Sequence, residues 1–120
     1  MTLHSMWTGR EFEISPETIT IVWPSTGPRG TDGTDISRNG DKIHCLESFE
    51  EMENLLKAEG LKFARVQYLE YDCLVNTDKI RYLEAKDEAT VIQVGFDFDD
   101  AILVDLPLEQ VINLLAAARR

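Results

Sequence analysis

The sequence predicts an α+β fold: two tandem β-rich units, each ending in an α-helix, related by a pseudo-twofold axis within a single compact domain. Three observations predict it. The chain has 120 residues, the length of one domain, of which 43% are hydrophobic and 28% charged. Short apolar runs of strand character alternate with turn signals and end twice in an amphipathic helical pattern. The stretch KIHCLESFEEMENLL (42–56) also matches AILVDLPLEQVINLL (101–115) in its apolar positions.

The first unit begins with strands. TLHSMWTGREFEI predicts a hairpin whose turn is Thr8-Gly9-Arg10, and SPET predicts a turn. The next strand starts in ITIVW, where Ile21 and Trp23 take alternate positions on one face.

A second hairpin and a helix complete this unit. TDISRNGDKIHCL predicts the hairpin, because Asn39-Gly40 suits a two-residue turn in which both positions need positive φ. SFEEMENLLKAEG predicts a helix with a capping box of Ser48 and Glu51, ending at Gly60.

The second unit follows the same plan. LKFARVQYL and DCLVNTDKIRYLEA contain strands around a polar turn, and TVIQVGF and AILVDL are strands joined by the acidic turn DFDD. PLEQVINLLAAARR predicts a helix with Pro107 in its first turn and Arg119 and Arg120 at its end. The shared order indicates a duplication, with one β-β-β-β-α repeat over 1–60 and a second over 61–120.

The charge balance restricts the class of partner. The chain carries 22 acidic and 12 basic residues, a net charge of −10. Affinity for nucleic acid comes largely from Lys and Arg that neutralise phosphates, so no direct nucleic-acid binding is expected. The same charge would suit a basic partner or a mimic of nucleic acid. No apolar run reaches membrane-spanning length and no signal-peptide pattern opens the chain, so we expect a cytoplasmic protein without membrane contact.

No catalytic or metal-binding pattern stands out. Cys45 and Cys73 lack CxxC spacing and are expected to be small buried side chains, and His4 and His44 add no ligand cluster. We therefore expect no cofactor, no metal and no enzymatic activity.

The Gly-rich stretch WPSTGPRGTDGTDISRNGDK holds the best candidate contact site. Its backbone amides, with Arg29 or Arg38 and with Trp23 as a stacking surface, could enclose a phosphate or carboxylate. The alternative is an ordinary long hairpin connection, and the sequence leaves the order of residues 24–40 open. The carboxylates of GFDFDDA could bind a hard cation, but an acidic hairpin tip is favoured.

The segments WTGREFEISPETITIV and IHCLESFEEMENLL, with a hairpin between them, resemble the small FlbD-like (SwrD) flagellar proteins. The matching features are a Gly turn, an Ile-containing strand, a Gly-centred hairpin and Glu-Ser before an acidic amphipathic helix. The second copy keeps the hydrophobic plan but loses the Gly turn. This resemblance implies a small non-enzymatic adaptor. A similar arrangement of strands before a helix occurs in LytTR-type DNA-binding domains, which should carry basic faces that this chain lacks.

Three functions are expected from the sequence. The first is a non-catalytic acidic binding or adaptor protein that acts through contacts with a protein partner or through self-assembly into a homo-oligomer. The second is a protein that sequesters a nucleotide-like anion, as in a phage or bacterial conflict system, with Trp23, Arg29 and Arg38 as ligand-binding residues. The third is an inhibitor that mimics nucleic acid.

Overall fold

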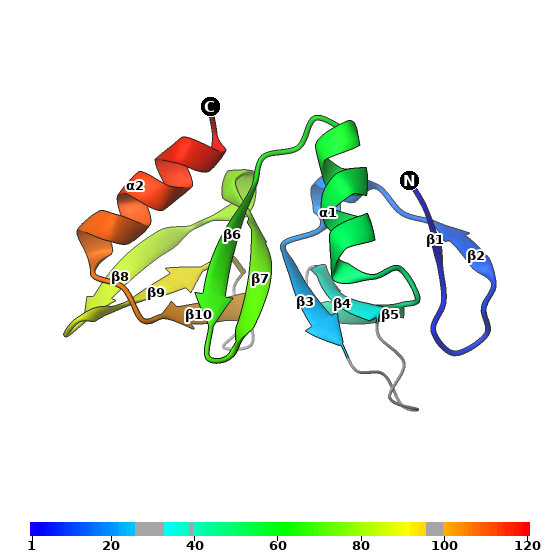
Figure 1. The fold of residues 1–120 in the computed structure, drawn as a ribbon, viewed down its shortest axis with the longest axis horizontal. Coiled ribbons are helices and arrows are strands. Elements are labelled where there is room, and N and C mark those ends of the chain that lie inside the picture. The colour runs from blue at the N-terminus through cyan, green and yellow to red at the C-terminus, as the bar shows by residue number, and fades with distance from the viewer. Residues whose placement is uncertain (26–32, 39, 96–99) are drawn as a thin grey trace.

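The computed structural model describes residues 1–25, 33–38, 40–95 and 100–120 (Figure 1). Its elements follow one another along the chain as β1 (Thr2–His4), β2 (Glu11–Glu13), η1 (Pro16–Thr18), β3 (Ile21–Ser25), β4 (Gly33–Arg38), β5 (Asp41–Cys45), α1 (Phe49–Ala58), β6 (Phe63–Tyr68), β7 (Tyr71–Asn76), η2 (Thr77–Lys79), β8 (Tyr82–Lys86), β9 (Ala89–Gln93), β10 (Ala101–Val104) and α2 (Leu108–Ala118). The α+β prediction is confirmed: the chain forms one compact domain of antiparallel sheets and two helices.

The strands form three antiparallel sheets. A two-stranded sheet has the order β1-β2, a central sheet has the order β5-β4-β3-β7-β6, and a three-stranded sheet has the order β10-β9-β8. The central sheet joins the two halves of the chain, because β3 pairs with β7 through Ile21↔Val75 and Val22↔Leu74. Figure 1 shows α1 beside the first-half strands of this sheet and α2 beside the three-stranded sheet.

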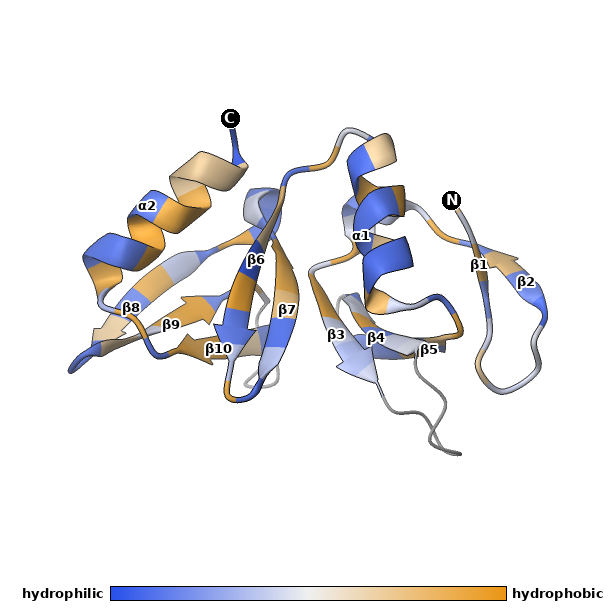
Figure 2. Cartoon of the chain, in the orientation of Figure 1, coloured by the Kyte–Doolittle hydropathy of each residue, from blue (hydrophilic) through white to orange (hydrophobic). Residues whose placement is uncertain are grey.

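The central sheet is buried on both faces. Successive strand residues face opposite sides, so neighbours in β3 and β7 enter different cores. Val22 and Leu74 join the core under α1, whereas Ile21 and Val75 join the core under the three-stranded sheet and α2. The hydropathy colouring shows the resulting mixture of apolar and polar positions along these strands (Figure 2). The two cores therefore share one sheet.

Local signals account for α1. The Ser48 side chain accepts a hydrogen bond from the Glu51 backbone N–H, and the Glu51 side chain accepts one from the Ser48 N–H, so the expected capping box is present. Beyond the helix, Gly60 has φ +76°, a conformation that suits glycine. Met52 and Leu56 are buried on the inner face of the helix.

The hairpin turns differ in how closely they match expectation. β4 and β5 pair up to Arg38↔Asp41, which leaves the predicted two-residue loop, with Gly40 at φ 89°; Asn39 lies outside the described residues. The turn of the first hairpin is wider than Thr8-Gly9-Arg10, since β1 ends at His4 and β2 begins at Glu11.

The order of elements is the same in both halves, with five strands and a short 3-10 helix before each α-helix. Five strands agree with the predicted order of hairpin, turn, strand, hairpin and helix, and are one more than the β-β-β-β-α description of the repeat contains. The pairing of the hairpins differs: β7 joins β3, whereas β2 pairs with β1 alone among the described strands. The duplication, its boundary at residue 60 and its pseudo-twofold axis stay predictions. Along the described ranges, no helix is long and apolar enough to cross a membrane.

Candidate functional site

Two of the three predicted ligand-binding residues, Trp23 and Arg38, lie in the part of the chain that the structure describes. Arg29 lies outside the described residues. Trp23 pairs with Asp35 across the β3–β4 ladder, and Arg38 lies three residues further along β4, roughly 10 Å away along the strand. Since alternate residues face opposite sides, Arg38 is also on the other face of the sheet from Asp35. Trp23 and Arg38 therefore lie on opposite faces of the sheet, and the contact site of the Gly-rich stretch stays a prediction.

The cysteines are not reactive groups. Cys45 and Cys73 are free and buried. Desolvation, with a smaller contribution from nearby carboxylates, raises the pKa of each thiol to about 12, so neither supplies a thiolate near neutral pH.

Each histidine is engaged with a carboxylate. His4 Nδ1 is 2.7 Å from Glu47 Oε2, and His44 Nδ1 is 2.5 Å from Asp35 Oδ1. Within the described ranges, no group of three or more His, Cys, Asp or Glu side chains could hold a metal ion. In the acidic turn, Asp100 is buried, while Asp97 and Asp99 fall outside those ranges.

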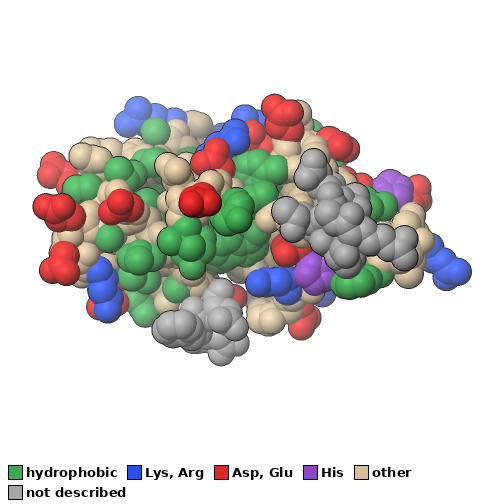
Figure 3. Space-filling model, turned by 60° about the horizontal axis from the view of Figure 1, so that its bottom comes forward, with side chains coloured by type: hydrophobic (Ala, Val, Ile, Leu, Met, Phe, Trp, Pro, Cys, Tyr) green, Lys and Arg blue, Asp and Glu red, His purple; other side chains and the backbone are tan. Residues whose placement is uncertain are grey.

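One face of the molecule is hollowed. A groove of about 820 Å³ lies between the central sheet and the three-stranded sheet, and we call it the underside groove. Figure 3 shows hydrophobic side chains gathered on this side of the molecule. The groove is lined by Trp23, Pro24, Asp35, Lys42, Tyr68, Leu69, Tyr71, Lys86, Val91, Ala101 and Leu103.

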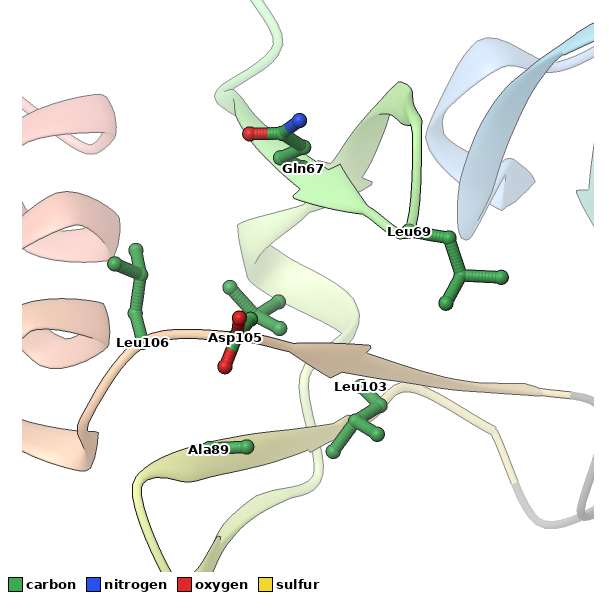
Figure 4. Close-up of a pocket in the computed structure, with 7 residues that line it drawn as sticks. Gln67, Leu69, Ala89, Leu103, Asp105 and Leu106 are labelled. Carbon is green, nitrogen blue, oxygen red and sulfur yellow. The ribbon is translucent and has the colours of Figure 1, made fainter.

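The underside groove continues into a smaller hollow of about 420 Å³, because Leu69 and Leu103 line both. Figure 4 shows this hollow between the β6–β7 hairpin, which contributes Gln67 and Leu69, and the strands that contribute Ala89 and Leu103. Asp105 places a carboxylate at this end.

Cationic side chains gather on the opposite side of the molecule. Four of them, which we call the seam cluster, come from three segments that meet between the two helices: Lys62, Lys79, Arg119 and Arg120. The connection between α1 and β6, which holds Lys62, runs along the top of Figure 1 near the C-terminus of the chain.

Hydrogen bonds hold the segments of the seam cluster together. Lys62 Nζ donates to the Arg120 carbonyl oxygen at 3.3 Å, and the Lys62 carbonyl oxygen accepts from Thr77 Oγ1 at 2.6 Å. Arg119 Nη1 donates to Thr77 Oγ1 at 3.2 Å and to Asp78 Oδ1 at 2.7 Å. These bonds join the three segments that carry the four cations, and within them Arg119 contacts the carboxylate of Asp78.

Sequence reasoning missed both surfaces. The cations of the seam cluster are separated by up to 58 positions along the chain, as in the contact between Lys62 and Arg120. The aromatic side chains of the groove, apart from Trp23, carried no signal beyond strand alternation. Neither set forms a motif in the sequence, because each is assembled by sheet pairing.

Comparisons with known proteins give one informative likeness. No family model matches the chain. No curated protein matches it either. A solved structure, described as the LytTr DNA-binding domain of a methyl-accepting/DNA response regulator from Bacillus cereus, is similar with a TM-score of 0.58 and 12% sequence identity. The likeness covers 97% of this chain and 94% of that chain.

This likeness corrects several expectations drawn from the sequence. The resemblance to FlbD-like flagellar proteins is wrong, because the fold of nearly the whole chain is that of the LytTr domain. The same finding overturns the predicted adaptor function and its two alternatives, nucleotide sequestration and nucleic-acid mimicry. It also overturns the predicted homo-oligomer and phage inhibitor. The sequence also predicts a protein, a second copy of the chain or a nucleotide-like ligand as the partner, with no direct binding of nucleic acid. The same finding contradicts this prediction.

The error has a physical cause. The net charge of −10 predicts a chain without a basic face, and this prediction argues against a LytTR-type domain. Net charge is a sum over the whole surface and does not say where the cations lie. The seam cluster collects four of the 12 basic residues of an acidic chain from three segments. By fold, the chain is similar to a LytTr DNA-binding domain.

Proposed function

We propose that this chain binds duplex DNA through the seam cluster, without catalysing a reaction, in the cytoplasm. The observation that carries the proposal is the fold likeness to a LytTr DNA-binding domain, which spans 97% of the chain. At 12% identity the likeness concerns the fold, so contacts with DNA have to be argued from this chain's own residues.

The seam cluster supports the proposal by its chemistry. Phosphate groups dominate the affinity of proteins for DNA, and Lys and Arg neutralise them. Lys62, Lys79 and Arg120 are exposed, and Arg119 remains exposed although it also contacts Asp78. Guanidinium groups bind phosphate oxygens with two parallel hydrogen bonds, whereas the lysines contribute point charges.

The overall charge sets the conditions for binding but does not prevent it. Exposed charges more than about 10 Å apart are largely screened at an ionic strength of about 0.1 M. The molecule measures 43 Å along its longest axis, so carboxylates at its two ends lie beyond that distance from a phosphate held at the seam cluster between the helices. We expect a modest affinity with steep dependence on salt concentration.

Fluorescence anisotropy with a short labelled duplex, titrated at several salt concentrations, tests the proposal. Four phosphate contacts predict a slope of log K against log [salt] of about −3 to −4. The double variant K62E/K79E should bind roughly tenfold or more weakly, with a slope shallower by about two. Both lysines are exposed, so the substitutions should leave the fold intact.

The matched control is K42E/K86E, which changes the net charge equally on the opposite side of the molecule. It should bind the duplex far more tightly than K62E/K79E does. Absence of duplex binding at low salt would overturn the function, and equal losses in the two double variants would overturn the assignment to the seam cluster.

A further inference from the structure

The underside groove is an apolar surface away from the seam cluster, and it is open among the residues that the structure describes. Three of its side chains are strongly exposed: Leu69 at 71%, Tyr71 at 55% and Leu103 at 46%. Scattered exposed hydrophobic residues are normal, but here they line one continuous hollow, which is typical of a binding site.

Aromatic rings in the groove are held in place. Trp23 packs edge-on against Tyr68, with ring centroids 5.3 Å apart and an interplanar angle of 75°. Its Nε1–H donates to Ser37 Oγ at 3.2 Å, which fixes the indole against the sheet. Tyr68 and Tyr71 are register partners at the end of the β6–β7 hairpin. Two half-buried rings and one exposed ring thus stand on a rigid sheet, ready to stack against planar groups.

The charge of the groove is opposite to that of the chain. Lys42 and Lys86 line it, and both are exposed. Asp35 is the carboxylate among its lining residues, and its Oδ1 is already 2.5 Å from His44 Nδ1. In a chain of net charge −10, a groove that offers two lysines beside aromatic rings is complementary to an anionic, aromatic ligand.

Backbone pairing argues against an extended peptide as the occupant. Peptides that add to a sheet use the unpaired N–H and C=O groups of an edge strand. β3 and β4, which carry Trp23 and Asp35, are hydrogen-bonded on both sides, β3 by β4 and β7 and β4 by β3 and β5. This part of the groove therefore offers side chains only.

We propose that the underside groove binds the unpaired bases of single-stranded DNA. Bases stack on the face of Tyr71 and beside Trp23, and Lys42 and Lys86 contact the phosphates on either side of them. The carboxylate of Asp105 makes the smaller hollow unfavourable for phosphate, so the strand occupies the larger hollow. This site is separate from the duplex-binding seam cluster and does not depend on it.

Tryptophan fluorescence provides a local readout. The chain has two tryptophans, so the variant W7F leaves Trp23 as the sole reporter. An oligothymidine of about 12 nucleotides, within the range of single-strand site sizes, should quench Trp23 fluorescence at low salt. In the same background, Y71A should weaken binding about tenfold, because it removes one stacking surface. The double variant K42E/K86E should weaken it to a similar extent and make the salt slope shallower.

Two matched controls separate local from general effects. Tyr82 is exposed to a similar degree, at 51%, but does not line the groove, so Y82A should keep the affinity of W7F. K62E/K79E should keep oligothymidine binding while losing duplex binding. Absence of quenching, or equal losses in Y71A and Y82A, would overturn the groove proposal. Quenching by an apolar peptide but not by oligothymidine would likewise overturn it, and duplex binding is measured independently of either result.

Discussion

His4 and Glu47 join the N-terminal hairpin to the connection between β5 and α1. Glu47 Oε1 accepts a hydrogen bond from the His4 backbone N–H at 2.9 Å, and Oε2 lies 2.7 Å from the imidazole. The hydrogen bond with Glu47 is the largest cause of a raised pKa for His4, and the charges of Glu47 and Glu11 raise it further against an opposing effect of desolvation.

This pair gives a prediction about pH. Because the pKa of His4 is raised in the folded state, protonation of His4 stabilises the fold. This stabilisation is fully present below the ordinary pKa of 6.5 and is lost as the pH rises above the raised pKa. E47Q keeps the acceptor for the backbone N–H but removes the charge. The free energy of unfolding of wild type should exceed that of E47Q by more at about pH 5.5 than at about pH 8.5, as measured by urea denaturation.

Nuclear magnetic resonance supplies the control for this prediction. The ring protons of His4 should titrate above 6.5 in wild type and closer to 6.5 in E47Q. An unchanged His4 titration in E47Q would contradict the assignment.

At the residue level the sequence indicated only part of the candidate sites. Trp23 was singled out as a stacking residue, and it does line the underside groove. Arg38 was grouped with it by proximity in the sequence, but strand alternation puts the two on opposite faces. Lys42 and Tyr71 could not be added from the sequence, because they reach Trp23 only through the β4–β5 and β3–β7 pairings.

Helix α1 shows how an element is specified locally. Its capping box satisfies two backbone N–H groups at the helix start, one through each side chain. S48A should lower the free energy of unfolding by about 1 kcal/mol, measured by urea denaturation.

The comparison is S15A. Ser15 precedes the 3-10 helix η1 and its side chain makes no capping hydrogen bond, so this substitution should change the unfolding free energy by less than about 0.5 kcal/mol. An equal effect of the two substitutions would mean that the capping box does not stabilise the domain.

Elements with local signals were predictable, and their assembly was not. Asn39-Gly40, Ser48 with Glu51, and Gly60 mark a hairpin and a helix by their own backbone requirements, and the structure places that hairpin and that helix there. The pairing of β3 with β7 depends on residues about 50 positions apart, for which strand alternation gives no partner. That one pairing joins the two halves of the chain in the central sheet.

The whole molecule depends on the shared central sheet. Residues 1–60 alone would expose the inner face of β3, because the core around Ile21 is completed by Val75 and by residues of the second half such as Ile92 and Val111. We therefore expect the chain to unfold in one transition, with coincident changes in tryptophan fluorescence, which reports on the first half, and in the resonances of α2. A fragment of residues 1–60 should lack a cooperative transition by circular dichroism. Two separate transitions, or a folded fragment, would contradict this expectation.

Charge distribution is also a property of the whole molecule. A net charge of −10 describes the chain correctly but conceals two surfaces of different character, one basic at the seam and one apolar with lysines on the underside. Composition sets solubility and the sensitivity of binding to salt, whereas the fold decides which charges lie together.

The β3–β7 ladder also bears on the order of events during synthesis. When residue 60 has left the ribosome, β3 has β4 as a neighbour but lacks the strand on its other side, which is complete only at Asn76. The nascent chain thus carries an open sheet edge with an apolar face until Asn76 has also left the ribosome. The final architecture then forms late and slowly relative to helical domains of this size, because its defining contact closes a long loop.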